Sequence, residues 1–223
     1  MGDRPTRRDV RRTYESIAIH FSKTRRYAWP EVEAFVQGRS GSLALDVGCG
    51  NGRHAELLAG SADRVVGLDV TRGLLVEARR RLREAGQSEV VELVQGDATT
   101  LPLAPSRVDL AVYIATIHHL PSRADRVESL RELARVLTGN GRALVSAWST
   151  AADRFEADAA EEMGFDTTLD WTRTNGETVP RFYHIYAPAE FEADVERAGL
   201  ELLDFEISSG NCYGVVTPEG KRP

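Results

Sequence analysis

The sequence has almost no lysine and almost no cysteine. Of its 28 Lys and Arg residues only Lys23 and Lys221 are lysines, and the two cysteines are Cys49 and Cys212. Two cysteines are too few for a disulfide framework or a cysteine-based zinc site. No apolar run has membrane-spanning length, and the first residues, M-G-D-R-P-T-R-R, contain no apolar signal core. We therefore expect a cytoplasmic protein without a membrane segment.

Charge is distributed unevenly along the chain, whose formal net charge is −6. Residues 1–30 contain eight Lys or Arg against three Asp or Glu, whereas residues 151–206 contain four Arg against fifteen acidic residues. A basic arm on an acidic body suits an anionic partner such as RNA. Charge alone nevertheless favours the simpler interpretation, a solvated amphipathic helix.

Apolar periodicity predicts alternating strands and helices. Val10, Tyr14, Ile17 and Phe21 have helical spacing, so residues 6–20 are predicted to form a helix, and Pro30 suits the first turn of a short second one ending near Val36. Further helices are predicted over residues 52–59, 72–85, 124–137 and 188–198. Gly139-Asn140-Gly141 would close the third of them, because its glycines can take positive φ. Strands are predicted at Leu43–Val47, Val65–Asp69, Val90–Val94, Val108–Ala115 and Arg142–Trp148, followed by an antiparallel pair at Glu201–Ile207 and Cys212–Thr217.

This alternation predicts a single domain over residues 1–223. Its fold class would be α/β, with a doubly wound, seven-stranded and mostly parallel sheet. Residues 1–37 would form an N-terminal helical extension. We interpret residues 149–187 as a partly ordered insert near the substrate site, because a structureless loop of that length is uncommon in a compact domain.

A glycine-rich loop, D-V-G-C-G-N-G-R (residues 46–53), follows the first predicted strand. In a doubly wound sheet this position lies at the carboxyl ends of the strands, where ligands bind. The G-x-G-x-G spacing differs from the G-x-G-x-x-G of dinucleotide folds, and Arg53 and His54 stand where a P-loop has Lys and Ser or Thr. The loop is therefore predicted to hold neither a dinucleotide nor a nucleoside triphosphate.

Three acidic residues narrow the choice of ligand. Asp69 ends the second strand, where a carboxylate can accept hydrogen bonds from both ribose hydroxyls, and Asp97 follows the third strand, where it can meet an adenine amino group. Asp46 adds negative charge that would repel a pyrophosphate and attract a cation. An adenosine ligand with a cation and no phosphate is S-adenosylmethionine. The predicted cofactor-binding residues are Asp46, Gly48, Cys49, Gly50, Asn51, Asp69, Val70, Asp97, Ala98 and Ala115.

The motifs L-D-V-G-C-G-N-G, V-V-G-L-D-V and Q-G-D-A, with the segment after the fourth strand, resemble the Rossmann-like class I methyltransferases. The segment Ile114–Leu120 lacks the Asn/Asp-Pro-Pro-aromatic motif of enzymes that methylate planar amino groups. Four stretches resemble, more specifically, the tRNA methyltransferases that esterify 5-carboxymethyluridine at the wobble position. They are Y-E-S-I-A-I-H-F-S-K-T-R-R-Y-A-W-P (14–30), D-V-G-C-G-N-G (46–52), I-A-T-I-H-H-L (114–120) and R-F-Y-H-I-Y (181–186).

Two other functions remain open at this point. A small-molecule O- or C-methyltransferase of quinone-biosynthesis type would share the second stretch and part of the third. A catalytically idle RNA-binding protein could use the same fold, although the intact Asp46, Gly48, Asp69 and Asp97 argue against it. The sequence also departs from the tRNA family after the fifth strand, where Trp148-Ser149-Thr150 replaces Trp-Ala and then Glu-Gln.

Methyl esterification, which the resemblance implies, needs a cationic clamp more than a general base, because a carboxylate is already ionised near neutral pH. Arg25 is the first candidate, since a guanidinium matches carboxylate geometry. The two adjacent histidines have no acid or cysteine at ligand spacing, so no metal is expected, and alternation predicts that only one of them faces the substrate. The candidate catalytic residues are Arg25, His118, His119, Tyr183 and His184, and the candidate substrate-binding residues are Arg25, Trp148, Arg181, Tyr183, His184 and Tyr186.

The resemblance implies two partners, the tRNA anticodon stem-loop and a small zinc-binding activator protein. Strand Val90–Val94 is apolar on both faces and would lie at a sheet edge, which needs a cover. A strand of the activator could pair with it, and flanking helices could cover it equally well. We expect poor solubility or low activity of the chain on its own.

Overall fold

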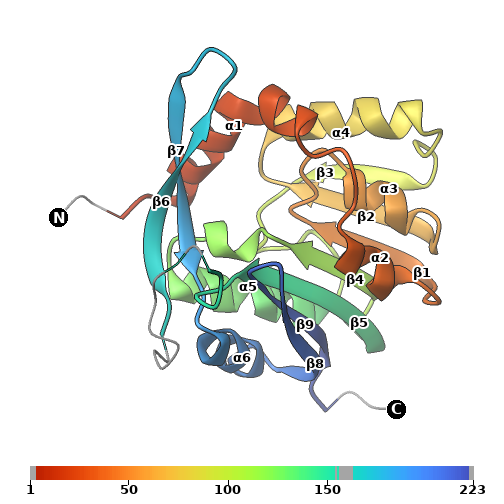
Figure 1. The fold of residues 1–223 in the computed structure, drawn as a ribbon. Helices are drawn as coiled ribbons and strands as arrows, with labels where there is room; N and C mark the ends of the chain where they lie inside the picture. Colours follow the sequence, from red (N-terminus) through yellow and green to blue (C-terminus); the bar gives the residue numbers. More distant parts are fainter. Residues whose placement is uncertain (1–3, 154, 156–162, 221–223) are drawn as a thin grey trace.

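The computed structural model describes residues 4–153, 155 and 163–220 (Figure 1). Seven strands form one sheet in the order β3-β2-β1-β4-β5-β9-β8, and β9 alone runs antiparallel to its neighbours. The predicted doubly wound and mostly parallel sheet is therefore confirmed. The strands, in chain order, are β1 (Gly41–Val47), β2 (Ala62–Asp69), β3 (Val91–Gln95), β4 (Val108–Ile114), β5 (Leu137–Trp148), β8 (Leu200–Ser208) and β9 (Asn211–Pro218).

Helices cover both faces of the sheet. On one face, α5 (Arg123–Val136) and α6 (Pro188–Arg197) bury Leu130, Leu133 and Phe191 in a core cluster with the strands. On the other face lie α2 (Pro30–Val36), α3 (Arg53–Leu58) and α4 (Arg72–Glu84). No helix in the described parts of the chain combines the length and the apolarity that crossing a bilayer requires.

Helix α1 (Arg7–Lys23) confirms the predicted N-terminal helix and continues one turn further. It begins with a capping box, in which the Thr6 hydroxyl accepts from the Asp9 N–H and the Asp9 carboxylate accepts from the Thr6 N–H. Its apolar face, with Tyr14, Ile17 and Ala18, packs on Leu74 of α4. This places α1 across the carboxyl ends of the strands, beside the glycine loop.

The described part of the insert at residues 149–187 contains an antiparallel hairpin, β6 (Phe165–Thr172) and β7 (Thr178–Ile185), which forms a two-stranded sheet of its own. The hairpin rises beside α1 (Figure 1). The Trp171 indole N–H donates to Nδ1 of His20 at 2.9 Å, and the Arg173 guanidinium donates to the Ser16 carbonyl at 3.0 Å. These contacts fix the hairpin as one wall over the sheet's carboxyl edge.

The prediction for Gly139-Asn140-Gly141 was wrong. Helix α5 passes directly into β5 through Leu137, whose backbone is extended, and neither glycine has positive φ. The register with β4 shifts between Leu137 and Arg142, so the three residues form an irregularity within β5. A side chain at Gly141 would approach the Val108 carbonyl at 2.8 Å, so close backbone packing explains that glycine.

Candidate active site

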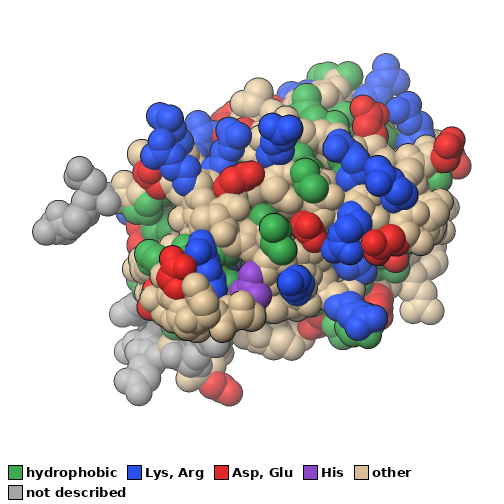
Figure 2. Space-filling view, turned by 90° about the horizontal axis from the view of Figure 1, so that it is seen from above, with side chains coloured by type: hydrophobic (Ala, Val, Ile, Leu, Met, Phe, Trp, Pro, Cys, Tyr) green, Lys and Arg blue, Asp and Glu red, His purple; other side chains and the backbone are tan. Residues whose placement is uncertain are grey.

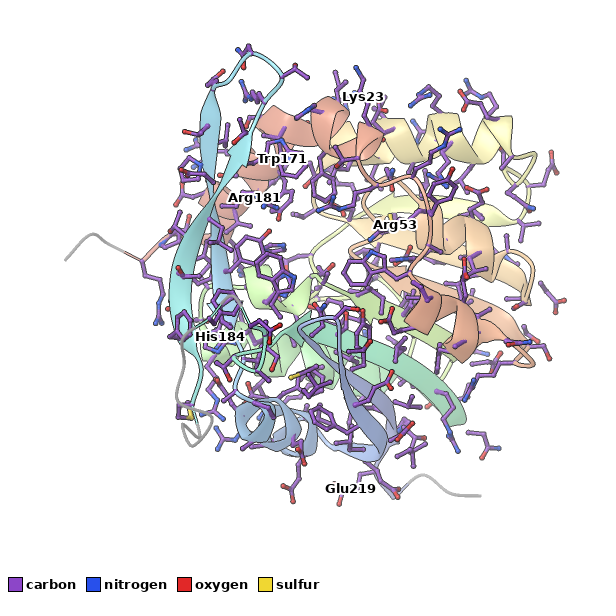
Figure 3. The ribbon with its side chains drawn as sticks, in the orientation of Figure 1. Lys23, Arg53, Trp171, Arg181, His184 and Glu219 are labelled. Carbon is purple, nitrogen blue, oxygen red and sulfur yellow. The ribbon has the colours of Figure 1, made fainter. Side chains whose placement is uncertain are left out.

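A pocket opens where β1, β2 and β4 end, between α1, the glycine loop and the β6–β7 hairpin (Figure 3). Nine of the ten predicted cofactor-binding residues line it, the exception being Asp46. Of the predicted acceptor-side residues, six line it: Arg25, His118, His119, Trp148, Arg181 and Tyr183. The structure therefore brings together predicted residues that are as far as 158 positions apart in the sequence, from Arg25 to Tyr183.

The glycine loop has a backbone that side chains would obstruct. Gly48 has a φ of 71°, and a Cβ atom there would overlap the Thr116 side chain after β4. Gly50 has a φ of 54°, and a Cβ atom there would meet nothing within 4 Å. Gly48 is thus needed for packing, while Gly50 leaves open space on the pocket side of the loop where a ligand can approach the backbone.

Asp69 supports the loop and remains available to a ligand. Its Oδ2 accepts from the Gly50 N–H at 2.9 Å and its Oδ1 from the Thr71 N–H at 2.7 Å. Burial raises the pKa of Asp69, and these two N–H groups partly lower it again. Each carboxylate oxygen keeps a second lone pair, as a ribose diol requires.

Asp97 borders the adenine end predicted from the sequence. Its carboxylate makes an ion pair with Arg7 of α1 at 2.9 Å and accepts from the Thr99 N–H at 2.9 Å. Asp97, Ala98 and Arg7 all line the pocket. The first turn of α1 is therefore fastened to the loop after β3, at the end of the pocket away from Arg25.

Asp46 lies behind the pocket wall instead of lining it, so the structure does not place it among the residues that a cofactor in the pocket would touch. Its side chain is buried, and Oδ2 has no hydrogen-bond partner among the described residues. Burial raises its pKa to about 7, with Arg53 lowering it and Asp69 raising it. Because no protein group pairs with Oδ2, its negative charge can act on a cation in the pocket through the field alone. This arrangement, with the open space at Gly50 and the Asp69 carboxylate, fits S-adenosylmethionine.

Three arginines face the acceptor side of the pocket. The guanidinium carbons of Arg25 and Arg181 lie 5.7 and 5.0 Å from the centre of the Trp171 ring, and that of Arg53 lies 5.1 Å from Trp29. Figure 3 labels Arg181 and Trp171 on the hairpin side and Arg53 on the sheet side. The aromatic rings hold these planar cations without neutralising them.

The electrostatics of this cluster favour an anion. Burial lowers the pKa of Arg25, and Arg181 lowers it further. Burial lowers the pKa of Arg53 to about 10, with Arg25 as the next lowering cause. A pKa of about 10 leaves Arg53 charged near neutral pH. Arg25 and Arg53 repel each other, and a bound carboxylate would relieve that repulsion.

An aromatic pair adjoins the arginines. The rings of Trp148 and Tyr183 stack with centroids 4.5 Å apart and planes inclined by 13°. Arg181 lies over the same Tyr183 ring at 5.0 Å. A flat, partly apolar surface thus lies next to the cationic cluster, as a planar base bearing an anionic substituent would require.

The adjacent histidines both line the pocket, which contains the cofactor side and the acceptor side, so which of them faces the substrate stays a prediction. They belong to a short 3-10 turn, Ile117–His119, where the alternation of an extended strand does not apply. His118 Nδ1 accepts from the Trp148 N–H at 3.0 Å, while His119 contacts the Phe182 carbonyl and the Tyr14 hydroxyl. Burial lowers the pKa of His118 well below its usual value and that of His119 to about 3. Both are neutral, so the arginines are the cationic groups in this part of the pocket.

His184 and Tyr186 lie outside the pocket lining, which corrects their assignment as substrate contacts. His184 lies between Asp166 and Glu190, with ring nitrogens 2.8 and 2.9 Å from the carboxylate oxygens. Tyr186 is fully buried, and Arg126 of α5 lies over its ring. Along a strand, side chains alternate between faces, so when Tyr183 faces the pocket the adjacent His184 faces the helices. These two residues anchor the hairpin to α5 and α6.

The sequence motifs missed several residues of the pocket. Arg53 directly follows the glycine loop and was considered only as the residue that excludes a P-loop. Phe21 and Trp29 line the pocket within the quoted stretch 14–30, and neither is among the candidate site residues predicted from the sequence. Trp171 does not line the pocket itself but lies against two of its arginines, and these contacts depend on the fold of the hairpin, which no local motif indicates.

Comparison with known proteins identifies the family. Residues 45–145 match the family described as Methyltransferase domain. An inferred methyltransferase of Encephalitozoon cuniculi is 31% identical over 213 residues, covering 94% of this chain and 95% of that one. The tRNA (carboxymethyluridine(34)-5-O)-methyltransferase of Saccharomyces cerevisiae is 33% identical over 174 residues, covering 77% of this chain and 59% of the yeast protein.

The fold has a solved counterpart. A methyltransferase chain in the complex with the Haloferax volcanii Trm112 methyltransferase activator superposes with a TM-score of 0.67 at 17% identity, covering 96% of this chain and 99% of that chain. The glycine loop, the hydrogen-bonded Asp69 and these sequence similarities all point to the same family. The chain belongs to the S-adenosylmethionine-dependent class I methyltransferases and, over most of its length, is similar in sequence to a tRNA carboxymethyluridine(34) methyltransferase.

Proposed function

We propose that this methyltransferase esterifies the carboxylate of 5-carboxymethyluridine at the wobble position of tRNA. The observation that carries the proposal is the convergence of Arg25, Arg53 and Arg181 on one pocket, next to the Trp148–Tyr183 stack. An arginine cluster selects an anionic acceptor, and the aromatic surface suits a planar base.

The reaction needs little from the protein beyond placement and charge. S-adenosylmethionine supplies a methyl group on a sulfonium. The acceptor carboxylate is already ionised, so the chain has to align one oxygen with that methyl group and exclude competing water. Arg25 and Arg181 would hold the carboxylate, with Trp171 fixing both guanidinium planes from the hairpin side. The neutral His118 and His119 would hold the pocket wall in place without acting as bases.

Sequence similarity supports a tRNA acceptor over a small molecule. The yeast relative that matches 77% of this chain is named for carboxymethyluridine(34). The chain spans 59% of that relative's length. The basic arm, with eight Lys or Arg in residues 1–30, is compatible with a nucleic-acid substrate.

An activator protein would bind at β3. This strand ends the sheet and has β2 as its one hydrogen-bonded neighbour among the described strands. Val91 is buried, and Leu93 and Val94 pack against the core clusters on the two faces of the sheet, so the strand's faces are covered while its outer edge has no partner strand in the described part of the chain. Strand addition by a partner would complete that edge. The Haloferax structural counterpart is a complex with a methyltransferase activator, which supports such a partner here.

The test is methyl transfer to defined RNA. We expect the protein, co-expressed with its host's activator, to add one methyl group to an anticodon stem-loop that carries 5-carboxymethyluridine at position 34. Nucleoside mass spectrometry would identify the methyl ester. The matched control is the same stem-loop with unmodified uridine, which lacks the carboxylate and should remain unmethylated. Equal labelling of both RNAs, or labelling of neither, would refute the proposal.

A further inference from the structure

The outer surfaces of α1 and α4 concentrate positive charge outside the pocket. Residues 7–26 and 72–84 together contain twelve Lys or Arg against four Asp or Glu. Arg7 and Arg25 line the pocket, and the other ten leave a net charge of +6 in a chain whose formal net charge is −6. The two helices pack together, with the Gly73 N–H donating to the Glu15 carboxylate at 3.0 Å. Figure 2, which looks down on this side of the molecule, shows many Lys and Arg side chains with Asp and Glu scattered among them.

Helical geometry arranges part of this charge in two stripes. At 100° per residue, three cations of α1 fall within about 60° of one another around the helix axis, and three of α4 fall within about 40°. All six are exposed. The basic platform, as we name this set, consists of Arg8, Arg12 and Lys23 on α1 and Arg72, Arg79 and Arg83 on α4.

Most of the platform's charge is not neutralised by the protein. Within the described chain, Arg12 is the one member with an ion pair, to Asp9 at 3.9 Å. By contrast, Arg80 on the same helix pairs with Glu77 at 2.8 Å and with Glu84 at 3.2 Å. Like charges four residues apart, as at Arg79 and Arg83, weaken a helix slightly. An external anion would remove that repulsion.

We propose that the basic platform binds the sugar-phosphate backbone of the RNA whose modified base enters the pocket. This inference rests on the proposed function. Helix α1 connects the two sites, because Tyr14 and Phe21 on its inner face line the pocket while Arg12 and Lys23 lie on its outer face. At 1.5 Å per residue the α4 stripe is about 16 Å long, enough to oppose several phosphates of a duplex.

A lipid surface fits this platform less well than RNA does. A membrane-bound helix presents a continuous apolar face to the bilayer. The apolar face of α1 is buried against α4, and the exposed apolar side chains near the stripes, Ile19 and Val76, stand singly. The acidic stretch 151–206 includes α6, which covers the opposite face of the sheet from α4. RNA lying on α1 and α4 would therefore avoid α6.

The experiment compares two triple variants with equal charge change. Arg72→Gln/Arg79→Gln/Arg83→Gln removes the α4 stripe, and Arg107→Gln/Arg131→Gln/Arg197→Gln removes three exposed arginines that lie off α1 and α4. The probe is the carboxymethyluridine stem-loop, whose Kd is measured over a range of salt concentrations. We expect the platform variant to bind about tenfold more weakly or worse at low salt, with a salt slope smaller by about 2–3. The control variant should stay within about twofold of wild type.

Two further readouts separate the possible failures. The Kd for S-adenosylmethionine should be the same in both variants, because neither changes the pocket. A platform variant with the wild-type salt slope would overturn the inference. It would also be overturned if the variant bound the stem-loop as wild type does and lost binding only to anionic phospholipid vesicles, measured in parallel. If wild type leaves the stem-loop unmethylated, the proposed function fails by itself, while the slope comparison on the same RNA still decides the platform.

Discussion

The Tyr14 hydroxyl lies 2.7 Å from Nε2 of His119 and joins α1 to the turn after β4. On the other side of the imidazole, Nδ1 lies 3.0 Å from the Phe182 carbonyl of β7. A carbonyl can only accept, so Nδ1 carries the proton and Nε2 accepts from Tyr14. One neutral histidine thus links the three walls of the pocket.

Replacing Tyr14 with phenylalanine should lower activity and stability together. The substitution leaves Nε2 of buried His119 without a donor, which costs about 1–3 kcal/mol. It also removes a hydroxyl that lies close to Tyr183 and Arg181. Burial raises the pKa of this hydroxyl most, Tyr183 raises it further, and Arg181 lowers it. We expect a lower Tm and a higher KM for the acceptor. Calorimetry and steady-state kinetics would measure the two effects.

Tyr27→Phe is the matched control for this substitution. Tyr27 is 73% exposed, and its hydroxyl has no hydrogen bond to a histidine in the described structure. This variant should have the Tm and KM of wild type. If Tyr14→Phe behaves as Tyr27→Phe does, the link through His119 contributes nothing measurable.

Arg25→Ala should reduce methyl transfer strongly while S-adenosylmethionine still binds. The residue lines the acceptor side, and its guanidinium lies over Phe21 and Trp171 at 4.8 and 5.7 Å. Loss of a charged group that orients and stabilises the reacting carboxylate is expected to lower kcat/KM by a factor on the order of 10²–10³. Single-turnover methyl transfer and a calorimetric titration with the cofactor would provide the two measurements.

Arg25→Lys distinguishes geometry from charge at the same position. Lysine keeps the positive charge but lacks the planar fork that pairs with a carboxylate and stacks on aromatic rings. We expect intermediate activity, with most of the loss in KM for the acceptor. Wild-type turnover in Arg25→Ala would remove this residue from the mechanism, whatever the lysine variant does.

The sequence predicts the cofactor side of the pocket better than the acceptor side. Gly48, Asp69 and Asp97 follow successive strands, and parallel strands bring their carboxyl ends to one edge, so local patterns are sufficient. The acceptor side depends on packing between distant segments. Trp171 meets His20, 151 positions away, through a hairpin whose docking no local pattern specifies. The sequence prediction also assigns His184 and Tyr186 to the pocket. In the structure the alternation of side chains along β7 turns His184 toward α6 instead.

Asp46→Asn should stabilise the protein without ligand, and more so at higher pH. Burial raises the pKa of this carboxyl from 3.8 to about 7. A group whose folded pKa is raised contributes stability that is fully present below the unfolded pKa and is lost as pH rises through the folded pKa. The wild type therefore loses stability between about pH 4 and pH 7, which the asparagine variant does not. At pH 8 we expect a gain on the order of 2–4 kcal/mol, measured by urea unfolding.

The control for this effect is Asp63→Asn, which removes the same charge at an exposed position near the start of β2. Its stability relative to wild type should change little between pH 5 and pH 8. The explanation for Asp46 would be wrong if the difference between wild type and Asp46→Asn were constant over that range, or if it shrank as pH rose.

Hydrogen exchange should locate the activator at β3 and leave the opposite sheet edge unchanged. The sheet ends at β3 on one side and at β8 on the other, so β8 serves as an internal control for β3. Added-strand pairing would engage the outward N–H groups of Val91–Gln95, and their exchange should slow by about tenfold or more in the complex. Amides of Leu200–Ser208 should exchange at equal rates with and without the partner. Protection confined to β8, or absent from both strands in a complex that still co-purifies, would place the activator on another surface of the enzyme.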